Sequence, residues 1–451
     1  MEICIKEGHL IRALQRAGVG PLDLKLMVLV GAPKSRGTFR FGKVRVAKEQ
    51  LELCQLLNAI PKHMPNPRIR SLEISTFTSF TFREDAFDVL EKFSFAALRS
   101  LKLDYHYRRI VEKVAKEAMG PSNLHLPTES LEIMKQCKWW NKLDGLTTME
   151  YYHNPYSVVD IRPILSTTRR LNSLSLSRAG ITSEESLVYG HEEFDLPLLT
   201  HLRLTASRVF WPIKCPSLTH LEIFHIPTGI KEPAERSIRL PHLVQLFCCA
   251  SPELFHLFRA FDAPALRRLK LLVVGGKESG ERGLKALWPL RLFSTPSQVP
   301  FTSTIEPVIF ELHRTNISSK WLARILSERM PVEEFISDAV LITHDFFEGL
   351  FPTKKTPSKE IKANGQGPTQ ENPPSDSQWY IGCPKLRRLV IDLSHYSPNK
   401  EKQVERSRLL DSAQKLMFMR SLAGVPLEKL AIRFSEQEEW VEASAHANDI
   451  H

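Results

Sequence analysis

Long apolar runs are scarce in this chain of 451 residues. No stretch approaches the roughly 18 consecutive apolar residues that a membrane-spanning helix needs, and the longest apolar run, residues 26–30, has the length of a strand. Residues 1–6 lack the basic start and apolar core of a secretion signal, and residues 448–451 carry no lipidation or retention motif. We therefore expect a cytoplasmic or nuclear protein that does not associate with membranes.

Cysteine is also sparse. The chain has 7 cysteines in scattered positions and no C-x-x-C pair, which argues against zinc ribbons and thioredoxin-like redox motifs. We expect reduced and mostly buried thiols, as is typical of cytosolic and nuclear proteins. The cysteines are Cys4, Cys54, Cys137, Cys215, Cys248, Cys249 and Cys383.

Motifs of catalysis and nucleotide binding are missing as well. The sequence contains no G-x-S-x-G elbow and no H-E-x-x-H metal motif. Residues 31–38 follow an apolar strand, as a P-loop does, but the second glycine, Gly37, comes one residue late and is followed by Thr38, not by lysine. This spacing favours a β-turn, and we expect no enzymatic activity, no cofactor and no metal.

The net charge is +10, from 61 basic and 51 acidic residues. A basic chain can indicate binding to nucleic acid or to an acidic partner, so a nucleic-acid-binding or general scaffold protein is one alternative function. The basic residues are, however, spread along the sequence and form no dense block. This distribution favours a moderately basic surface over a nucleic-acid footprint.

A short phrase, Leu-x-x-Leu-x-Leu, recurs along the chain. Nine good copies begin at Ile69, Leu98, Leu171, Leu199, Leu218, Leu243, Leu266, Leu386 and Leu427. A looser copy begins at Leu146, and weaker ones are Ile305-x-x-Val308-x-Phe310 and a segment near Phe335. In the central part, from Leu171 to Leu266, successive copies begin 19 to 28 residues apart, close to the about 20–29 residues of leucine-rich repeats.

Proline precedes the first leucine by two residues in five copies, at Pro197, Pro216, Pro241, Pro264 and Pro384. Proline ends a preceding helix and fixes φ, so we expect a turn before each strand. Stretches such as Leu-Arg-Leu and Leu-Lys-Leu alternate with the period of a strand, which favours strands over a helical array of the HEAT type. The second and third leucines then point into a core that stacked copies bury together.

The pattern predicts an α/β leucine-rich-repeat solenoid, with a curved parallel sheet on the concave face and helices and loops on the convex face. We expect helical return paths at residues 182–189 and 253–261. An N-terminal α/β cap segment spans residues 1–65, with helices at 7–17 and 48–60 and strands at 22–26 and 39–46. The solenoid covers residues 66–352. A disordered insert, rich in Pro, Gly, Ser and Asn, occupies residues 353–378, and C-terminal repeats and a tail follow at 379–451.

Residues 10–18 and 21–24, followed by 40–46 and by lead-ins such as residues 216–223, resemble F-box/leucine-rich-repeat proteins of mushroom-forming fungi. The resemblance implies a substrate-recognition module of an SCF-type ubiquitin ligase, whose F-box docks to the Skp1 adaptor and so to cullin. The F-box opening, Leu-Pro-x-Glu, does not precede residue 10. Ser251-Pro252-Glu253-Leu254 is similar to it but falls between two repeats, where we interpret it as a helix start. Ligase partners are therefore expected only if an F-box lies upstream or has diverged.

Alternation places a row of polar and aromatic side chains on the open, concave face of the sheet, and this face is the candidate protein-binding surface. Its candidate residues are Glu73, Lys102, Glu150, Arg203, Glu222, Phe224, Phe247, Arg268 and Lys270, with Ser175 in the same row. The mixed signs suit a protein partner better than a phosphate backbone, and Phe224 and Phe247 are the anchor candidates. For any one of these residues taken alone, a solvated side chain without a specific role is the favoured interpretation. His201 and His220 are expected to be neighbours there, as a surface pair and not a metal site, because two ligands leave zinc underfilled.

Overall fold

In the computed structural model, the chain divides into two compact units, Met1–Pro233 and Ala234–His451. The described residues are 12, 15–16, 20–28, 55, 57–64, 68–76, 93, 95–105, 142–152, 159–160, 165–177, 179–180, 194–205, 213–224, 238–250, 261–273, 308–313, 318–327, 332–338, 340, 342–354, 379–394, 402–435 and 438–443. Among these residues, no helix has the length and apolarity that crossing a membrane requires.

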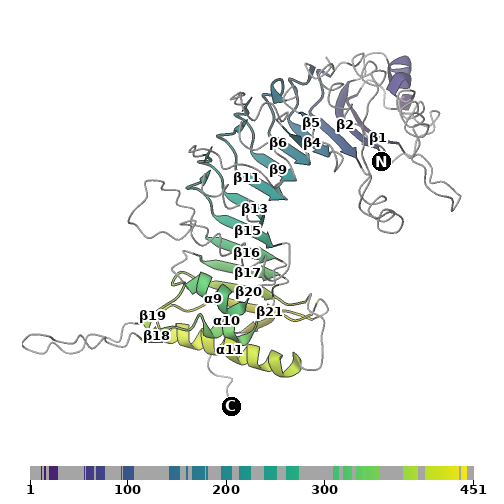
Figure 1. Ribbon diagram of the computed structural model, residues 1–451. Coiled ribbons are helices and arrows are strands. Elements are labelled where there is room, and N and C mark those ends of the chain that lie inside the picture. The colour runs from purple at the N-terminus through teal and green to yellow at the C-terminus, as the bar shows by residue number, and fades with distance from the viewer. Residues whose placement is uncertain are drawn as a thin grey trace, which may run out of the picture. The chain divides into compact units, whose positions relative to one another are not determined.

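The first unit is built on parallel strands that follow one another in chain order. They are β1 (Leu22–Val28), β2 (Ile69–Thr76), β3 (Ser100–Tyr105), β4 (Thr148–Tyr152), β6 (Ser173–Ser177), β9 (His201–Thr205) and β11 (His220–Phe224). Each is paired in parallel with the next. Strand β1 continues the sheet beyond β2, so the segment expected to cap the array contributes a strand at the sheet's edge (Figure 1).

The second unit repeats this plan. Its sheet strands are β13 (Gln245–Ala250), β15 (Arg268–Val273), β16 (Ile309–His313), β17 (Glu334–Asp338), β20 (Arg388–Asp392), β21 (Lys429–Arg433) and β22 (Val441–Ala443). All of these pairings are parallel except the last, in which β22 runs antiparallel to β21. The prediction of an α/β chain with a repeated parallel sheet is confirmed.

The leucine phrase defines the repeat as predicted. The residues at the second and third leucine positions of each good copy are buried, as Leu202 and Leu204 are in β9. In all five copies with the proline, the first leucine closes a β-turn: the Leu199 N–H donates to the Leu196 carbonyl at 3.1 Å, and Leu218 does the same to Cys215. Proline occupies the second position of these turns, where its fixed φ is favourable. The prediction of a turn before the strand is confirmed.

One weak copy was predicted in the wrong register. Strand β16 pairs Phe310 with Leu269 and Leu312 with Leu271, so the core positions are Phe310 and Leu312 and not Val308 and Phe310. A slip of two residues keeps every side chain on the same face, so alternation alone does not distinguish the two registers. The segment near Phe335 does form a repeat strand, β17, in which Ser337 takes the third core position.

Between sheet strands, the chain returns through short two-residue strands. They are β5 (Val159–Asp160) with β7 (Ala179–Gly180), β8 (Phe194–Asp195) with β10 (Ile213–Lys214), and β12 (Ile238–Arg239) with β14 (Phe261–Asp262). The return helices expected at residues 182–189 and 253–261 fall outside the described residues, except that Phe261 belongs to β14. In the described parts of these connecting segments, the secondary structure therefore consists of short strands.

In the described part of the second unit, three helices cover the core side of the sheet (Figure 1). They are α9 (Ser319–Ser327), α10 (His344–Glu348) and α11 (Lys402–Leu422). Phe346 of α10 packs on Phe335 of β17 with ring centroids 5.9 Å apart, and Phe335 packs on Phe310 of β16 at 5.7 Å. Because the helices pack on the sheet face that carries Phe310 and Phe335, the polar side chains of these strands lie on the opposite face.

The two ends of the expected insert are joined. Strands β18 (Thr353–Lys354) and β19 (Trp379–Tyr380) pair antiparallel, so the first two residues assigned to the insert form a strand. Residues 355–378 lie outside the described part of the chain, as does the strand expected at 39–46. Residues 12, 15–16, 55 and 57–63 are helical, in line with the two helices expected near the N-terminus.

The described cysteines have the expected character. Cys215, Cys248, Cys249 and Cys383 are buried thiols outside any disulfide, and burial raises the pKa of Cys215 and of Cys383 to about 12. Thiols in this state are poor nucleophiles at neutral pH. Cys4, Cys54 and Cys137 lie outside the described residues.

Candidate functional site on the open sheet face

The candidate residues of the first unit lie in one row across the sheet. Parallel register places Glu73 opposite Lys102, Lys102 opposite Glu150 and Arg203 opposite Glu222. Two further residues complete the row: Lys25 lies opposite Glu73, and Ser175 lies between Glu150 and Arg203. We call the sheet surface that carries this row the open face.

Ion pairs link the charges of this row. Glu73 Oε1 lies 3.3 Å from the Lys25 ammonium and 3.6 Å from the Lys102 ammonium, and the same Lys102 lies 3.6 Å from Glu150. Arg203 lies 3.4 Å from Glu222. Such half-exposed pairs add little stability, but they neutralise the cations of the face and fix the order of positive and negative groups along it.

Phe224, one of the two anchor candidates, lies beside this row. It occupies the position of β11 two residues after Glu222, and the Arg203 guanidinium lies over its ring, 5.2 Å from the centroid. The ring is half-buried. Arginine stacked on an aromatic ring is a pre-ordered contact patch of the kind enriched at protein interfaces.

His201 and His220 are neighbours on the open face, as predicted. They face each other across β9 and β11, with rings stacked at 4.4 Å between centroids and only 9° between planes. Burial lowers the pKa of His220, and the nearby His201 lowers it further. Two stacked imidazoles repel each other when both are charged, so the stacking disfavours the protonated form of His220.

In the second unit, the predicted residues converge on a glutamate that sequence reasoning missed. Lys270 lies opposite Phe247 on one side and Glu311 on the other, and its ammonium lies 5.0 Å from the Phe247 ring centroid. Arg268 Nε donates to Glu311 Oε1 at 2.6 Å, and Lys270 lies 3.6 Å from Oε2. The two-residue register error in β16 had hidden Glu311, because it placed Ile309 in the middle row.

Glu311 is the most buried charge of the described open face, with 3% of its side chain exposed. Burial alone would raise its pKa, but hydrogen bonds from His313 and Arg268 and the charges of Arg268 and Lys270 lower the pKa to about 2. His313 continues the network, because its Nδ1 lies 2.9 Å from Asp338 Oδ2 and its Nε2 lies 3.3 Å from Glu311 Oε2. Both contacts are hydrogen bonds only when the imidazole is protonated.

Beyond Glu311 the middle row loses its charge. Ile336, Val390 and Ala431 follow it in register. Beside them, Asp392 and Arg433 form a close ion pair, and the Arg433 guanidinium lies 5.0 Å from the Trp440 ring. The open face therefore changes from an alternating charged row to an apolar strip edged by charged pairs.

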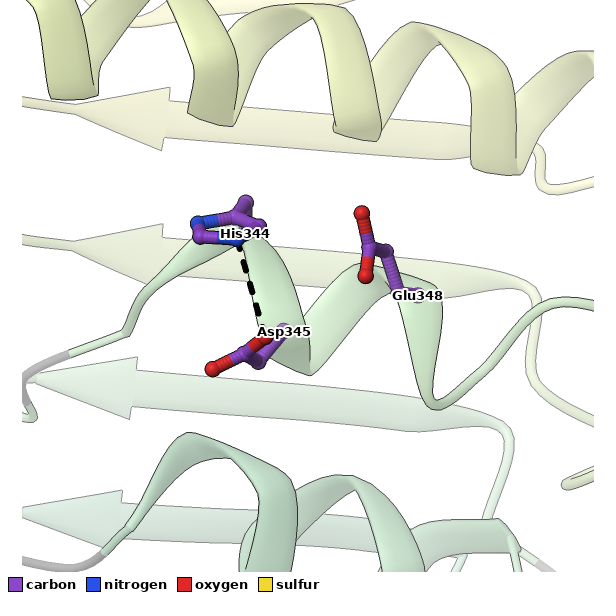
Figure 2. Close-up of side chains that lie close together, drawn as sticks. All are labelled: His344, Asp345 and Glu348. Carbon is purple, nitrogen blue, oxygen red and sulfur yellow. Dashed lines mark ion pairs between the residues drawn. The ribbon is translucent and has the colours of Figure 1, made fainter.

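Three side chains of α10 form the densest group of possible metal ligands among the described residues. His344, Asp345 and Glu348 each place a ligand atom within 4.8 Å of the others, and His344 Nε2 lies 3.6 Å from Asp345 Oδ1 (Figure 2). Asp345 and Glu348 are exposed. The group lies on a helix of 5 residues, and nothing in the described structure orients its ligand atoms toward a common point.

The described open face therefore offers paired charges, aromatic anchors and a pair of imidazoles. Its carboxylates and cations are engaged with one another and do not converge on a nucleophile. No protein-family model matches the chain, and no curated protein sequence matches it significantly.

Proposed function

We propose that this chain is a leucine-rich-repeat solenoid whose open face binds another protein, and that it catalyses no reaction. The turn-and-strand repeat supports the repeat class, because the first, second and third leucine positions of the phrase are buried in successive copies within each unit. The observation that carries the function is the row from Lys25 to Glu222, in which charges of opposite sign alternate and pair.

This order of charges supports a protein partner over nucleic acid. A phosphate backbone needs cations that are available to replace its counterions, whereas Lys25, Lys102, Arg203, Arg268 and Lys270 each contact a carboxylate of the face. A polypeptide that carries both positive and negative side chains can replace each of these ion pairs within the face by an ion pair with the partner. The net charge of +10 then speeds encounter with acidic partners and does not by itself define a nucleic-acid site.

The resemblance to F-box/leucine-rich-repeat proteins extends the proposal to a biological role. On that basis, the partner is a protein recognised for ubiquitin ligation, in the cytoplasm or nucleus. Skp1 and cullin would be recovered with the chain only if an F-box is present in a diverged or upstream form. Recovery of the partner without Skp1 would indicate recognition uncoupled from the ligase.

A pair of matched variants tests the binding face. Arg203→Ala and Phe224→Ala should each lower the affinity for proteins captured from the native cell extract by about 30-fold, the effect of losing roughly 2 kcal/mol at an interface anchor. Leu198→Ala is the control, because Leu198 is an exposed apolar side chain of the turn that precedes β9. Quantitative mass spectrometry of the captured proteins provides the measurement.

The nucleic-acid alternative is tested in parallel by fluorescence anisotropy with DNA and RNA oligonucleotides of mixed sequence. The proposal expects weak binding that Phe224→Ala leaves unchanged. Tight, steeply salt-dependent binding, together with protein capture that all three variants leave equal, would show that the alternative is correct.

A further inference from the structure

The charged row of the first unit has a regular spacing. Parallel register places one member of the row on each of the seven strands from β1 to β11, and neighbouring strands lie about 4.8 Å apart. From Lys25 to Glu222, the order of charges is positive, negative, positive, negative, uncharged, positive, negative, and Ser175 is the uncharged member. On the first four strands, charges of the same sign therefore recur about every 9.6 Å.

Ser175 divides the row into two blocks that are each paired internally. Glu150 pairs with Lys102 on one side of it, and Arg203 pairs with Glu222 on the other. The six charged side chains of the row are between 22% and 51% exposed. Ion pairs at this exposure contribute little stability, so a partner that offers charges of the opposite sign can replace them at small cost.

The row next to these charges is made of short side chains. Two residues before a member of the charged row, the side chain points to the same face of the sheet. On β2, β3, β4 and β6 this position holds Ser71, Ser100, Thr148 and Ser173. Because these side chains are shorter than lysine and glutamate, a rod-shaped segment can lie across the strands beside the charged row.

The spacing of the row distinguishes between regular backbones that could lie along it. On one face of an α-helix, side chains follow at every third or fourth residue, or about 5.3 Å on average, so the mismatch with the strands is about 0.5 Å per step. On one face of an extended strand the step is about 6.7 Å, which loses register within about two steps. A polyproline helix repeats every 9.3 Å or about that distance, so it can follow charges of one sign but not both.

We propose that the open face of the first unit binds an α-helix of the partner, which lies across the strands and alternates acidic and basic side chains at every third or fourth residue. The inference rests on the proposed function and specifies the binding segment of the partner. The acidic side chains of this helix lie opposite the three cations of the row, and its basic side chains lie opposite the three carboxylates. An uncharged residue lies opposite Ser175. Ion pairs within each surface are thus exchanged for ion pairs between the two surfaces.

Synthetic peptides of about 22 residues, long enough to span the row as a helix, test the inference on the full-length chain by fluorescence anisotropy. The alternating peptide carries the predicted order of charges on an alanine-rich helix. A blocked peptide has the same composition, with its three acidic positions before its three basic ones, and should bind at least about 10-fold more weakly, because two of its charges then meet charges of the same sign. Acidic residues near its N-terminus keep it helical.

A third peptide separates the helix from the charges. It is the alternating peptide with proline at the uncharged position, so its charges are unchanged and its helix is broken. We expect it to bind at least about 10-fold more weakly than the alternating peptide.

A reciprocal charge reversal tests the register. Lys102→Glu should weaken binding of the alternating peptide by about 10-fold. A peptide with lysine in place of the glutamate that faces this position should restore binding to the variant and bind the wild type about 10-fold more weakly. Lys214→Glu, which reverses an exposed lysine of the connecting strand β10, should leave all affinities unchanged. Circular dichroism establishes that both variants are folded.

Several results would overturn the helical partner: equal affinities for the alternating and blocked peptides, a proline peptide that binds as well as the alternating one, or no binding of any peptide up to about 1 mM. Protein capture from cell extract separates this failure from that of the proposed function. If Arg203→Ala and Phe224→Ala still reduce capture, the open face binds protein through another kind of segment. If they do not, the proposed function fails as well.

Discussion

Replacing Arg420 by methionine is expected to lower the free energy of unfolding of the second unit by about 3–5 kcal/mol. Arg420 lies in α11 and is fully buried. Its guanidinium donates to the carbonyls of Gly382, Cys383 and Leu386 at 3.0–3.2 Å. Methionine fills much of the same volume but removes one donor from each of three carbonyls, and of the three only Cys383 has another donor among the described residues, the backbone N–H of Leu386.

These three carbonyls belong to the turn that leads into β20. Cys383 has a φ of +51° there, a conformation that costs energy for a residue with a Cβ and persists only when its surroundings hold it. Arg420 thus joins the long helix to the repeat turn. Losing it should both loosen the turn and release α11 from the sheet.

Differential scanning calorimetry of the full chain measures the effect. We expect the transition of the second unit to fall by about 10 °C, at about 2–4 °C per kcal/mol for a unit of this size. Arg408→Met is the matched control, because Arg408 lies on the same helix with its side chain exposed, and it should change the transition by less than about 2 °C. Equal shifts in the two variants would contradict the structural role of Arg420.

The second large effect is expected at Glu311. Glu311→Gln should cost the second unit about 2–3 kcal/mol at pH 7, because the buried carboxylate that Arg268, Lys270 and His313 share is replaced by a neutral amide. The variant keeps the size and shape of the side chain. The loss therefore reports charge and not packing.

The contribution of Glu311 to the free energy of unfolding should decrease as the pH falls. The pKa of Glu311 in the folded chain is about 2, below its ordinary value of 4.5. A carboxyl with a lowered pKa stabilises the fold above its ordinary pKa, and that contribution disappears as the pH falls from about 4.5 to about 2. Because solvent screens the charges of the partly exposed Arg268 and Lys270, we expect this pH-dependent part of the free energy of unfolding to be only about 1–2 kcal/mol.

Urea unfolding at a series of pH values from 7 to 2 checks both statements. The gap in free energy between the wild type and Glu311→Gln should narrow as the pH falls. Lys429→Gln is a control for general charge effects, since Lys429 pairs only with the exposed Glu442 among the described residues, and its gap from the wild type should stay small. A gap for Glu311→Gln that does not depend on pH would show that the carboxylate charge contributes nothing.

The repeat was predictable because two independent signals coincide in it. Leucines at positions one, four and six mark the buried face, and a proline two residues before the first leucine marks the turn. Together these two signals predicted the buried positions of β9, β11 and β13 in the correct register. In β16 the leucine signal weakens, because Pro307 stands at the first position of the phrase and Phe310 at the second. The proline signal weakens too, because no proline stands two residues before the first position. A two-residue slip then leaves the alternation unchanged.

The same reason explains what was missed on the open face. Glu311 follows from the register of β16 and from nothing else in the sequence. The pairing of His201 with His220 was predictable from the repeat phrase, whereas the hydrogen bonds of the threonines beside the two rings depend on the carbonyls of Asn172 and Thr200, each just before a neighbouring strand. Arg420 carries no sequence signal of its own, since Arg406 and Arg408 lie on the same helix and are not fully buried.

Site-specific photo-crosslinking tests the central claim most directly. A benzophenone amino acid is placed at Glu150, in the middle row of the open face, and at Leu198, in the exposed turn before β9, and each full-length chain is irradiated in native cell extract. We predict that a protein partner is crosslinked from position 150, that excess unlabelled wild-type chain competes with it, and that position 198 gives no such product. Equal crosslinking from both positions, or products that nuclease removes, would contradict a protein-binding open face.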